Sequence, residues 1–440
     1  MSESILNCYD SHTHFLATGQ IASELSLKNL KSAEEIRHVA IEKKHYRGNW
    51  VVGFGWNNNQ WESSELPTKK ILDELFPDTP VFLSRVDGHA SWINSKAIAV
   101  LESQGYNFRA DPLGGKIERD RNGEPTGLLF DQAHIQALIR LPDFTDVQIE
   151  QFLIDAAQLF NRGGFTHVRD MSMTFRQWEI QKKLGQQKKI NIYCEGFITV
   201  ESIADLERGF EDYKKCLASV HTRLKIKGLK IFIDGSLGSK TAYLSQNYVG
   251  QKQRGLLIWS AVDIKTAIAF CWRNKIEIAI HTIGDEAVHI AAQSAREVSA
   301  AGLLGKLHLE HVQLLRPETL QLLKPLHVYI HMQPCHWLSD HTWLLSSIGD
   351  LTKFLFQWEQ LRRNKIHVDF GSDSPIEPTD LLRNRRALME SAKKGIPALT
   401  DDWKKFHSYI TPNWGQGRTE FDDENILRVE LDGEIIFSGS

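Results

Sequence analysis

The sequence lacks several features that would assign it to a specialised class of protein. Its five cysteines are scattered without a C-x-x-C pair, which predicts free thiols in a reducing compartment, the cytoplasm. No run of about 18 apolar residues occurs, so we expect no membrane span. The first ten residues have neither a basic segment nor an apolar core, so we expect no signal peptide. The 52 basic and 55 acidic residues nearly cancel, which predicts no nucleic-acid surface.

The composition is that of a folded protein with a large apolar core. Of the 440 residues, 42% are hydrophobic and 24% are charged, proportions that are typical of globular proteins and exclude extensive disorder. The length exceeds that of one ordinary domain but suits a barrel that carries insertions. The most informative count is that of the 18 histidines, because several of them end apolar segments.

Short apolar strands alternate with helical patterns along most of the chain. The first strand is SILNCYDSH, and seven more are expected at 165–171, 190–196, 229–235, 276–282, 307–313, 328–334 and 367–375. Amphipathic patterns such as DVQIEQFLIDAAQLFNRG lie between most of them. Nearly continuous apolar strands that alternate with helices favour a parallel sheet covered by helices. Eight such units predict an α/β fold, the (β/α)8 TIM barrel.

Residues 45–145 do not fit this alternation. They contain the strand-like segments WVVGFGWN and PVFLSRVDGH and the turn-rich segment DPLGGKIERDRNGEPTG. We interpret them as a large insertion between the first and second strands. The barrel then comprises residues 1–44 and 146–400, and residues 401–440 form a short C-terminal β segment. An insertion after a strand emerges at the C-terminal face of the barrel, where active sites lie.

Side chains that can bind metal stand at the ends of the predicted strands. His12 and His14 end the first strand, and their spacing of two places them on one face. The fourth, fifth, sixth and eighth strands end with Lys230, His281, His311 and Asp373. A single histidine at a strand end is usually structural, and an H-x-H pair alone is weak evidence. The conjunction on several strands predicts a metal centre, because imidazole and carboxylate suit zinc-like cations.

The ordered motifs of the chain resemble those of a known enzyme superfamily. DSHTH, GLKIFIDGSLGS, IHTIGDEAV, LEHVQ and GSDSP resemble the metal motifs of the amidohydrolase superfamily. GFGWNNNQW, LSRVDGHASWINSKA, PTGLLFD and MQPCHWLSD resemble its YtcJ-like branch, the amidohydrolase 3 family. The resemblance covers most of the chain and implies the TIM-barrel fold and a metal-dependent hydrolase.

The resemblance also implies roles for the residues at the strand ends. His12, His14 and Asp373 would bind the more buried divalent ion, and His281 and His311 would bind a second one. Lys230 would bridge the two ions as an N-carboxylated lysine. The alternative is an unmodified lysine that pairs with Asp234 or Asp373 in a one-metal site. Zinc is the expected metal, although these ligands also suit iron, manganese and cobalt.

The expected reaction is hydrolysis of a C–N bond in a small molecule, such as an amide or N-formyl group. A divalent cation lowers the pKa of its water to about 7, and Asp373 would accept the proton and pass it to the leaving nitrogen. One alternative is deamination of a cyclic amidine, which usually needs one metal. The other is a barrel that only binds ligands. Lys230 favours the two-metal hydrolase, and the complete ligand set favours an enzyme.

Five further residues are candidates for substrate contacts. Arg85 and His89 belong to SRVDGH in the insertion, Trp56 could form an apolar pocket wall, and His336 with Asp340 could line the pocket. A structural role is the alternative for each, above all for the tryptophan.

The chain departs from the family pattern at its two ends. Members of the family usually have a β-sandwich built from strands before the H-x-H motif and from a C-terminal segment with a GKxAD piece. Here the motif lies near the N-terminus, the piece is absent, and NILRVELDGEIIFSGS keeps two short strands. We therefore expect a reduced β appendage, and a second copy of the chain in a homodimer is one way to cover that flank.

Overall fold

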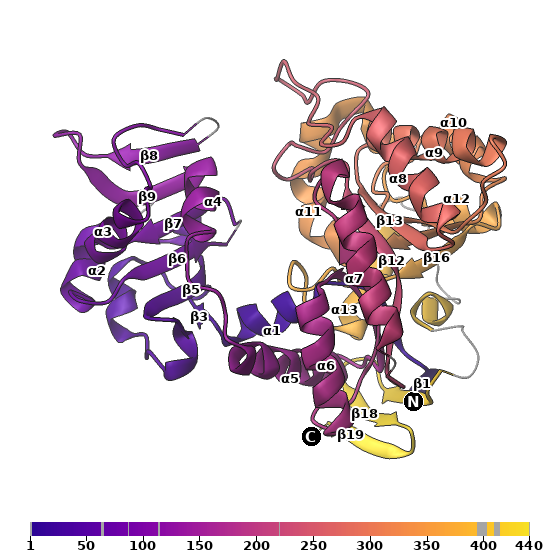
Figure 1. The fold of residues 1–440 in the computed structure, drawn as a ribbon, viewed down its shortest axis with the longest axis horizontal. Coiled ribbons are helices and arrows are strands. Elements are labelled where there is room, and N and C mark those ends of the chain that lie inside the picture. Colours follow the sequence, from indigo (N-terminus) through magenta and orange to yellow (C-terminus); the bar gives the residue numbers. More distant parts are fainter. Residues whose placement is uncertain are drawn as a thin grey trace. The chain divides into compact units, whose positions relative to one another are not determined.

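The computed structural model describes residues 2–62, 66–86, 88–112, 115–219, 221–393, 403–408 and 414–439. The chain divides into two compact units. One contains Met1–Gly19 and Leu153–Ser440, and the other contains Gln20–Phe152 (Figure 1). In the part of the chain that the structure describes, no helix is both long and apolar enough to cross a membrane.

The first unit is built on eight parallel strands, which confirms the predicted TIM barrel. In spatial order they are β2 (Tyr9–Thr13), β10 (His167–Met173), β11 (Tyr193–Thr199), β12 (Leu224–Phe232), β13 (Glu277–Thr282), β14 (Leu307–His311), β15 (Val328–Met332) and β16 (His367–Phe370). Each of the eight predicted segments overlaps one of these strands. The barrel is nearly closed, because a parallel bridge joins Thr13, at the end of β2, to Ser374 beyond β16.

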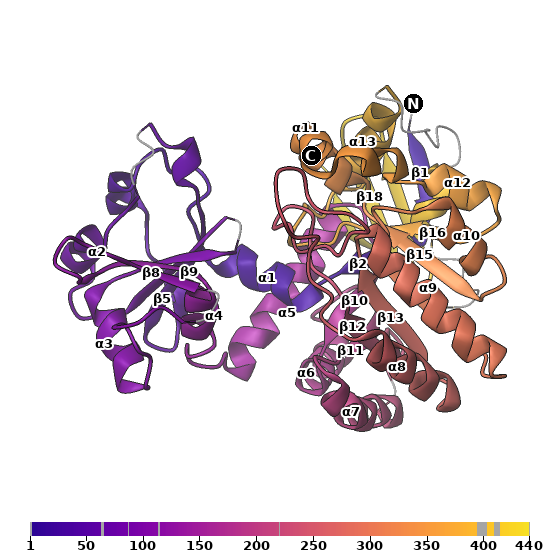
Figure 2. The same cartoon turned by 90° about the horizontal axis from the view of Figure 1, so that it is seen from above.

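Helices follow the strands and cover the outside of the barrel (Figure 2). They are α1 (Phe15–Ser23), α5 (Asp146–Arg162), α6 (Phe175–Gln186), α7 (Leu206–Ala218), α8 (Ala261–Arg273), α9 (Asp285–Ala300), α10 (Pro317–Leu323), α11 (Pro334–Ile348), α12 (Trp358–Arg363) and α13 (Leu381–Lys393). Local sequence starts some of them: the hydroxyls of Thr174 and Ser260 accept hydrogen bonds from backbone N–H groups in the first turns of α6 and α8.

The predicted first strand is wrong in one respect, because SILNCYDSH forms two strands. Asn7 adopts a positive φ of 48°, a conformation that asparagine tolerates, and it separates β1 (Glu3–Leu6) from β2. β1 joins an antiparallel sheet with β17 (Gly417–Phe421), β18 (Ile426–Leu431) and β19 (Glu434–Ser438). The two strands expected in NILRVELDGEIIFSGS are β18 and β19, and β17 adds a third strand from the C-terminal segment.

The second unit has its own sheet and its own core. Its strands follow the spatial order β3 (Leu25–Ser26), β5 (Trp50–Trp56), β6 (Val81–Arg85), β7 (Ala90–Ile93), β9 (Pro125–Asp131) and β8 (Gly115–Arg119), and β4 (Tyr46–Arg47) pairs with β5. Three helices complete it: α2 (Lys69–Leu75), α3 (Ser95–Ser103) and α4 (Gln132–Leu138). The expected insertion begins at residue 45, whereas this unit begins at Gln20, because β3 pairs with β5.

The interior of the barrel is unusually polar. The register of neighbouring strands aligns Glu310 on β14 with His331 on β15, and His331 with Asp369 on β16. Arg169 on β10 and Glu195 on β11 are register partners and are also buried. Branched apolar side chains usually fill the interior of this fold, so these charged groups need an explanation beyond packing.

Candidate metal centre

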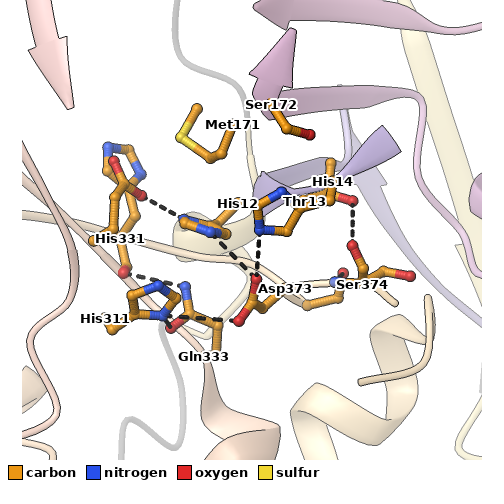
Figure 3. A network of polar contacts seen from close by, with 12 residues as sticks. His12, Thr13, His14, Met171, Ser172, His311, His331, Gln333, Asp373 and Ser374 are labelled. Atoms are coloured by element: carbon orange, nitrogen blue, oxygen red, sulfur yellow. Dashed lines mark hydrogen bonds and ion pairs between the residues drawn. The ribbon is translucent and has the colours of Figure 1, made fainter. Parts of the chain in front are cut away.

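The predicted ligands from the first and last strands meet at the seam that closes the barrel. The Nε2 atoms of His12 and His14 lie 3.3 and 3.4 Å from Oδ1 of Asp373 (Figure 3). His12 is fully buried and His14 is partly exposed. The donor atoms of these three residues are close enough together to hold one metal ion.

A second pair of imidazoles faces the other oxygen of the same carboxylate. Nε2 of His336 lies 3.4 Å from Oδ2 of Asp373, and Nδ1 of His311 lies 4.0 Å from it. These three residues also form a group that could hold a metal ion. Asp373 is therefore the centre of the cluster, with two imidazoles facing each oxygen.

Backbone hydrogen bonds between the first and last strands fix Asp373 in this position. The N–H of Asp373 donates to the carbonyl of His12, and the N–H of His14 donates to the carbonyl of Ser374, both at 2.8 Å. Oδ1 of Asp10 accepts from the N–H groups of Ser372 and His12 at 2.9 and 3.2 Å. Asp373 itself has a φ of 58°, a left-handed conformation that turns its carboxylate away from the ordinary path of the strand.

The hydrogen bonds of His12 determine which of its nitrogens can bind metal. Its Nδ1 lies 2.6 Å from Oε2 of Glu310, whose other oxygen accepts from Nη1 of Arg169 at 2.9 Å. Burial alone would raise the pKa of Glu310, but Arg169, His331 and His12 outweigh it and hold this pKa well below its ordinary value. The carboxylate is therefore ionised and accepts the Nδ1–H, so that Nε2 of His12 presents its lone pair to Asp373.

This arrangement fits a cation. Nε2 of His12 and Oδ1 of Asp373 are both buried, and neither makes a hydrogen bond with any residue that the structure describes. Two lone-pair atoms 3.3 Å apart repel each other unless a positive charge lies between or beside them. The donor set of imidazole and carboxylate is that of zinc and related ions.

His311 and His281 are oriented in the same way as His12, because one ring nitrogen of each is hydrogen-bonded to an oxygen atom. Nδ1 of His311 donates to Oε1 of Gln333 at 2.8 Å, and Nε2 of Gln333 donates to the carbonyl of His331 at 3.2 Å, which fixes the direction of the amide. Nε2 of His281 donates to the carbonyl of Gly235 at 3.3 Å. The ring centroids of His281 and His311 are 4.5 Å apart, and burial lowers the pKa of His281 to about 3. Both rings are therefore neutral, and each keeps one nitrogen with a free lone pair.

Lys230 is fully buried on β12, and its amine has no hydrogen bond or ion pair among the described residues. Its Nζ lies 4.5 Å from the centroid of the Phe232 ring, and burial lowers its pKa to about 8. The alternative, an ion pair of Lys230 with Asp234 or Asp373, does not occur among the described residues. The Asp234 carboxylate instead accepts hydrogen bonds from the N–H groups of Tyr243, Ile283 and Gly284.

Four of the five candidates for substrate contacts lie in different environments. His336, in the first turn of α11, joins the metal cluster, and its Nδ1 lies 2.9 Å from Nε2 of Gln313. The other three belong to the second unit. Nε of Arg85 donates to Oδ1 of Asn58 at 3.3 Å, and the exposed His89 lies 3.2 Å from Oδ1 of Asp131. Trp56 is 0% exposed and donates to the carbonyl of Leu83, so it packs in the core instead of lining a pocket.

Sequence reasoning missed three residues that touch the cluster or its neighbours: Glu310, Arg169 and Gln333. Each lies inside a segment predicted to be a buried strand: Glu310 in LHLEHVQ, Arg169 in FTHVRDM and Gln333 in VYIHMQP. A charged residue within a strand that is buried on both faces is the signal that could have identified the first two, since such groups are rare without a partner. Nothing in the sequence shows that they meet.

Comparison with known proteins agrees with this geometry. The sequence model of the amidohydrolase family matches residues 9–398 of the chain. YtcJ of Bacillus subtilis (strain 168), which is named as an amidohydrolase, is 31% identical over 387 residues, which are 85% of this chain and 70% of that protein. The N-substituted formamide deformylase of Arthrobacter pascens is 26% identical over 69% of this chain and 57% of its own length.

A solved structure supports the same assignment. The crystal structure of an uncharacterized metal-dependent hydrolase from Pyrococcus furiosus superposes with a TM-score of 0.71 and 26% sequence identity, over 88% of this chain and 77% of that one. Family match, relatives and fold agree with the polar cluster at the barrel mouth. The chain therefore belongs to the amidohydrolase family of metal-dependent hydrolases.

Proposed function

We propose that the protein hydrolyses C–N bonds other than peptide bonds in small molecules, with amides and N-formyl compounds as its substrate class. The observation that carries the proposal is the pair of buried lone-pair atoms, Nε2 of His12 and Oδ1 of Asp373, which face each other at 3.3 Å. The relative that is named as an N-substituted formamide deformylase favours the formyl group within this class.

The cluster offers ligands for one or two divalent ions, with zinc as the expected metal. His12, His14 and Asp373 would hold the first, His281 and His311 would hold the second, and Lys230 as a carbamate would bind both. When bound, such an ion supplies Lewis acidity and makes hydroxide available near neutral pH. The carboxylate of Asp373 accepts the proton of the attacking water and returns it to the leaving nitrogen. His336 faces Oδ2 of this carboxylate, which supports its proposed role in contacting the substrate.

Lys230 would serve as a ligand only after carboxylation. An ammonium group has no lone pair, whereas a neutral amine attacks the carbon of CO2, forms an N–C bond and releases one proton. Burial favours the neutral amine, because it lowers the pKa of Lys230 to about 8. The resulting carbamate has one negative charge shared by two oxygens, and these oxygens would serve as ligands for a cation.

The second unit contributes the residues that we propose for substrate recognition, His89 and Arg85. Two motifs of the sequence meet there. His89 belongs to LSRVDGHASWINSKA, and it contacts Asp131, the last residue of PTGLLFD. Asp131 has φ and ψ values of 50° and -119°, which are unfavourable for a residue other than glycine. Backbone strain of this kind is concentrated at functional sites. The five free, buried cysteines support a reducing compartment, the cytoplasm.

The reaction class is tested with purified protein reconstituted with Zn²⁺ and a panel of N-formyl compounds, amides and cyclic amidines. We expect formate or carboxylate from the first two groups, and a loss of about 10²–10⁴-fold in kcat for Asp373→Asn, which keeps the shape but cannot accept the proton. Ammonia released from a cyclic amidine would show a deaminase instead. A near-wild-type kcat for Asp373→Asn would remove this residue from the mechanism.

The metal assignment is tested by the metal content of His12→Ala. This change removes the lone pair that faces Asp373, so we expect loss of the bound ion with an unchanged circular dichroism spectrum. His289→Ala is the matched control, because His289 is partly buried and bonds to Thr319 outside the cluster. Full metal retention in His12→Ala, measured by mass spectrometry after dialysis, would contradict the assignment.

Carboxylation of Lys230 is detectable without any substrate. After incubation with ¹³C-bicarbonate and Zn²⁺, we expect a ¹³C carbamate resonance that disappears in Lys230→Met. Lys227→Met should keep the resonance, because Lys227 lies on the same strand but pairs with Glu195. Identical spectra for the wild type and Lys230→Met would favour the one-metal alternative with an unmodified lysine.

The role of the second unit is tested through substrate affinity. His89→Ala and Arg85→Ala should raise KM or change selectivity across the panel while metal content stays constant. His38→Ala controls for the loss of an imidazole from the same unit, since His38 is exposed. Unchanged kinetics of both variants toward every substrate that is turned over would exclude them from recognition.

A further inference from the structure

We propose that Glu310 and Arg169 form a positioning pair that holds His12 in the tautomer and orientation required for metal binding. The inference rests on the proposed function to the extent that the cluster binds a divalent ion. It adds that the affinity for this ion depends on two residues that do not touch it.

The three side chains form one buried chain of contacts. Glu310 accepts the Nδ1–H of His12 at 2.6 Å with one oxygen and the Nη1–H of Arg169 at 2.9 Å with the other. The side chains of His12 and Glu310 are 0% exposed, and that of Arg169 is 1% exposed. Without competing water, these charged hydrogen bonds are strong and directional.

The side chain of Arg169 makes two further contacts besides its bond to Glu310. Its Nη1 also donates to the carbonyl of Ser11 at 3.2 Å, the residue directly before His12. Its guanidinium lies 4.4 Å from the centroid of the Phe197 ring. Because β10 is the neighbour of β2 whereas β14 lies across the barrel, the Arg169–Glu310 bond spans the interior and joins two distant strands. The orientation of Glu310 relative to His12 is thus fixed by several elements.

Stability alone gives a poor explanation for this pair. A buried ion pair is often no more stabilising than apolar side chains of similar volume, because both charges lose their hydration. Apolar side chains are also what this fold usually places in the interior. The effect on His12 provides a reason: a carboxylate that accepts the Nδ1–H makes Nε2 the lone-pair atom and raises its basicity as a ligand. Partners of this kind typically change metal affinity 10–100-fold.

The interior supplies a matched control in Glu195. This carboxylate is also buried, 4% exposed, and also pairs with a cation, because Lys227 lies 3.3 Å from it. Its hydroxyl partner is Tyr9, at 3.4 Å, whereas the carboxylate that bonds to His12 is that of Glu310. Glu195→Gln therefore removes a buried negative charge from the same barrel without changing the partner of a proposed ligand.

The experiment measures Zn²⁺ affinity of the metal-free protein by competition with a chelator, for the wild type, Glu310→Gln and Glu195→Gln. We expect Glu310→Gln to weaken binding about 10–100-fold and Glu195→Gln to leave it close to wild type. The second measurement is the ¹⁵N NMR spectrum of the histidine side chains in metal-free protein. It should show His12 as the Nδ1–H tautomer in the wild type and in Glu195→Gln, but a mixture in Glu310→Gln.

Glu310→Gln leaves Arg169 buried without its carboxylate and risks misfolding. The double variant Glu310→Gln/Arg169→Met avoids the unpaired charge, and we expect it to fold and to bind Zn²⁺ as weakly as the single variant. Wild-type affinity in either Glu310 variant, with His12 in the same tautomer, would overturn the positioning role and leave the proposed hydrolase intact. A wild-type protein that binds no Zn²⁺ would overturn the metal centre itself.

Discussion

The seam between the first and last barrel strands is the constraint on which the site depends. Two backbone hydrogen bonds, from Asp373 to His12 and from His14 to Ser374, join the first and last strands of the barrel. These bonds involve the same residues that bring imidazole and carboxylate together. A shift of one residue in this register would turn the side chains to the opposite face, since neighbours in a strand alternate. Closure of the fold and assembly of the cluster are therefore one structural event.

The polar interior beneath this seam follows from the needs of the cluster. A neutral imidazole can bind a cation through one nitrogen only if the other nitrogen has an acceptor for its proton. The barrel supplies a different acceptor for each ring: Glu310 for His12, Gln333 for His311 and the carbonyl of Gly235 for His281. Each acceptor needs a partner of its own, which for Glu310 is Arg169. Polarity thus extends from the mouth into layers that packing alone would fill with apolar residues.

The sequence was sufficient to predict the barrel and the residues at its mouth, because both depend on local patterns. Apolar strands of the right length show where the sheet lies, and polar residues at their ends show where side chains converge. Contacts between strands on opposite sides of the barrel produce no local pattern in the sequence. The pairing of Glu310 with Arg169 joins residues 141 positions apart on strands that are not neighbours. The kink at Asn7 was also hidden, because the apolar run continues through it while the backbone changes direction.

The second unit has apolar cores of its own, and this affects how an enzyme of this kind could change its selectivity for substrates. Both apolar clusters of the second unit consist of residues from that unit alone, with Trp56 and Trp92 in one and Trp50 and Phe82 in the other. Substitution of an exposed polar residue of this unit, such as His89, therefore leaves both of these apolar clusters intact. The barrel has no comparable freedom, because its buried charges are coupled through shared partners and replacement of one leaves another unpaired. Under the proposed role of His89 and Arg85, variation in substrate preference is expected in the second unit, and constancy is expected in the ionic interior of the first.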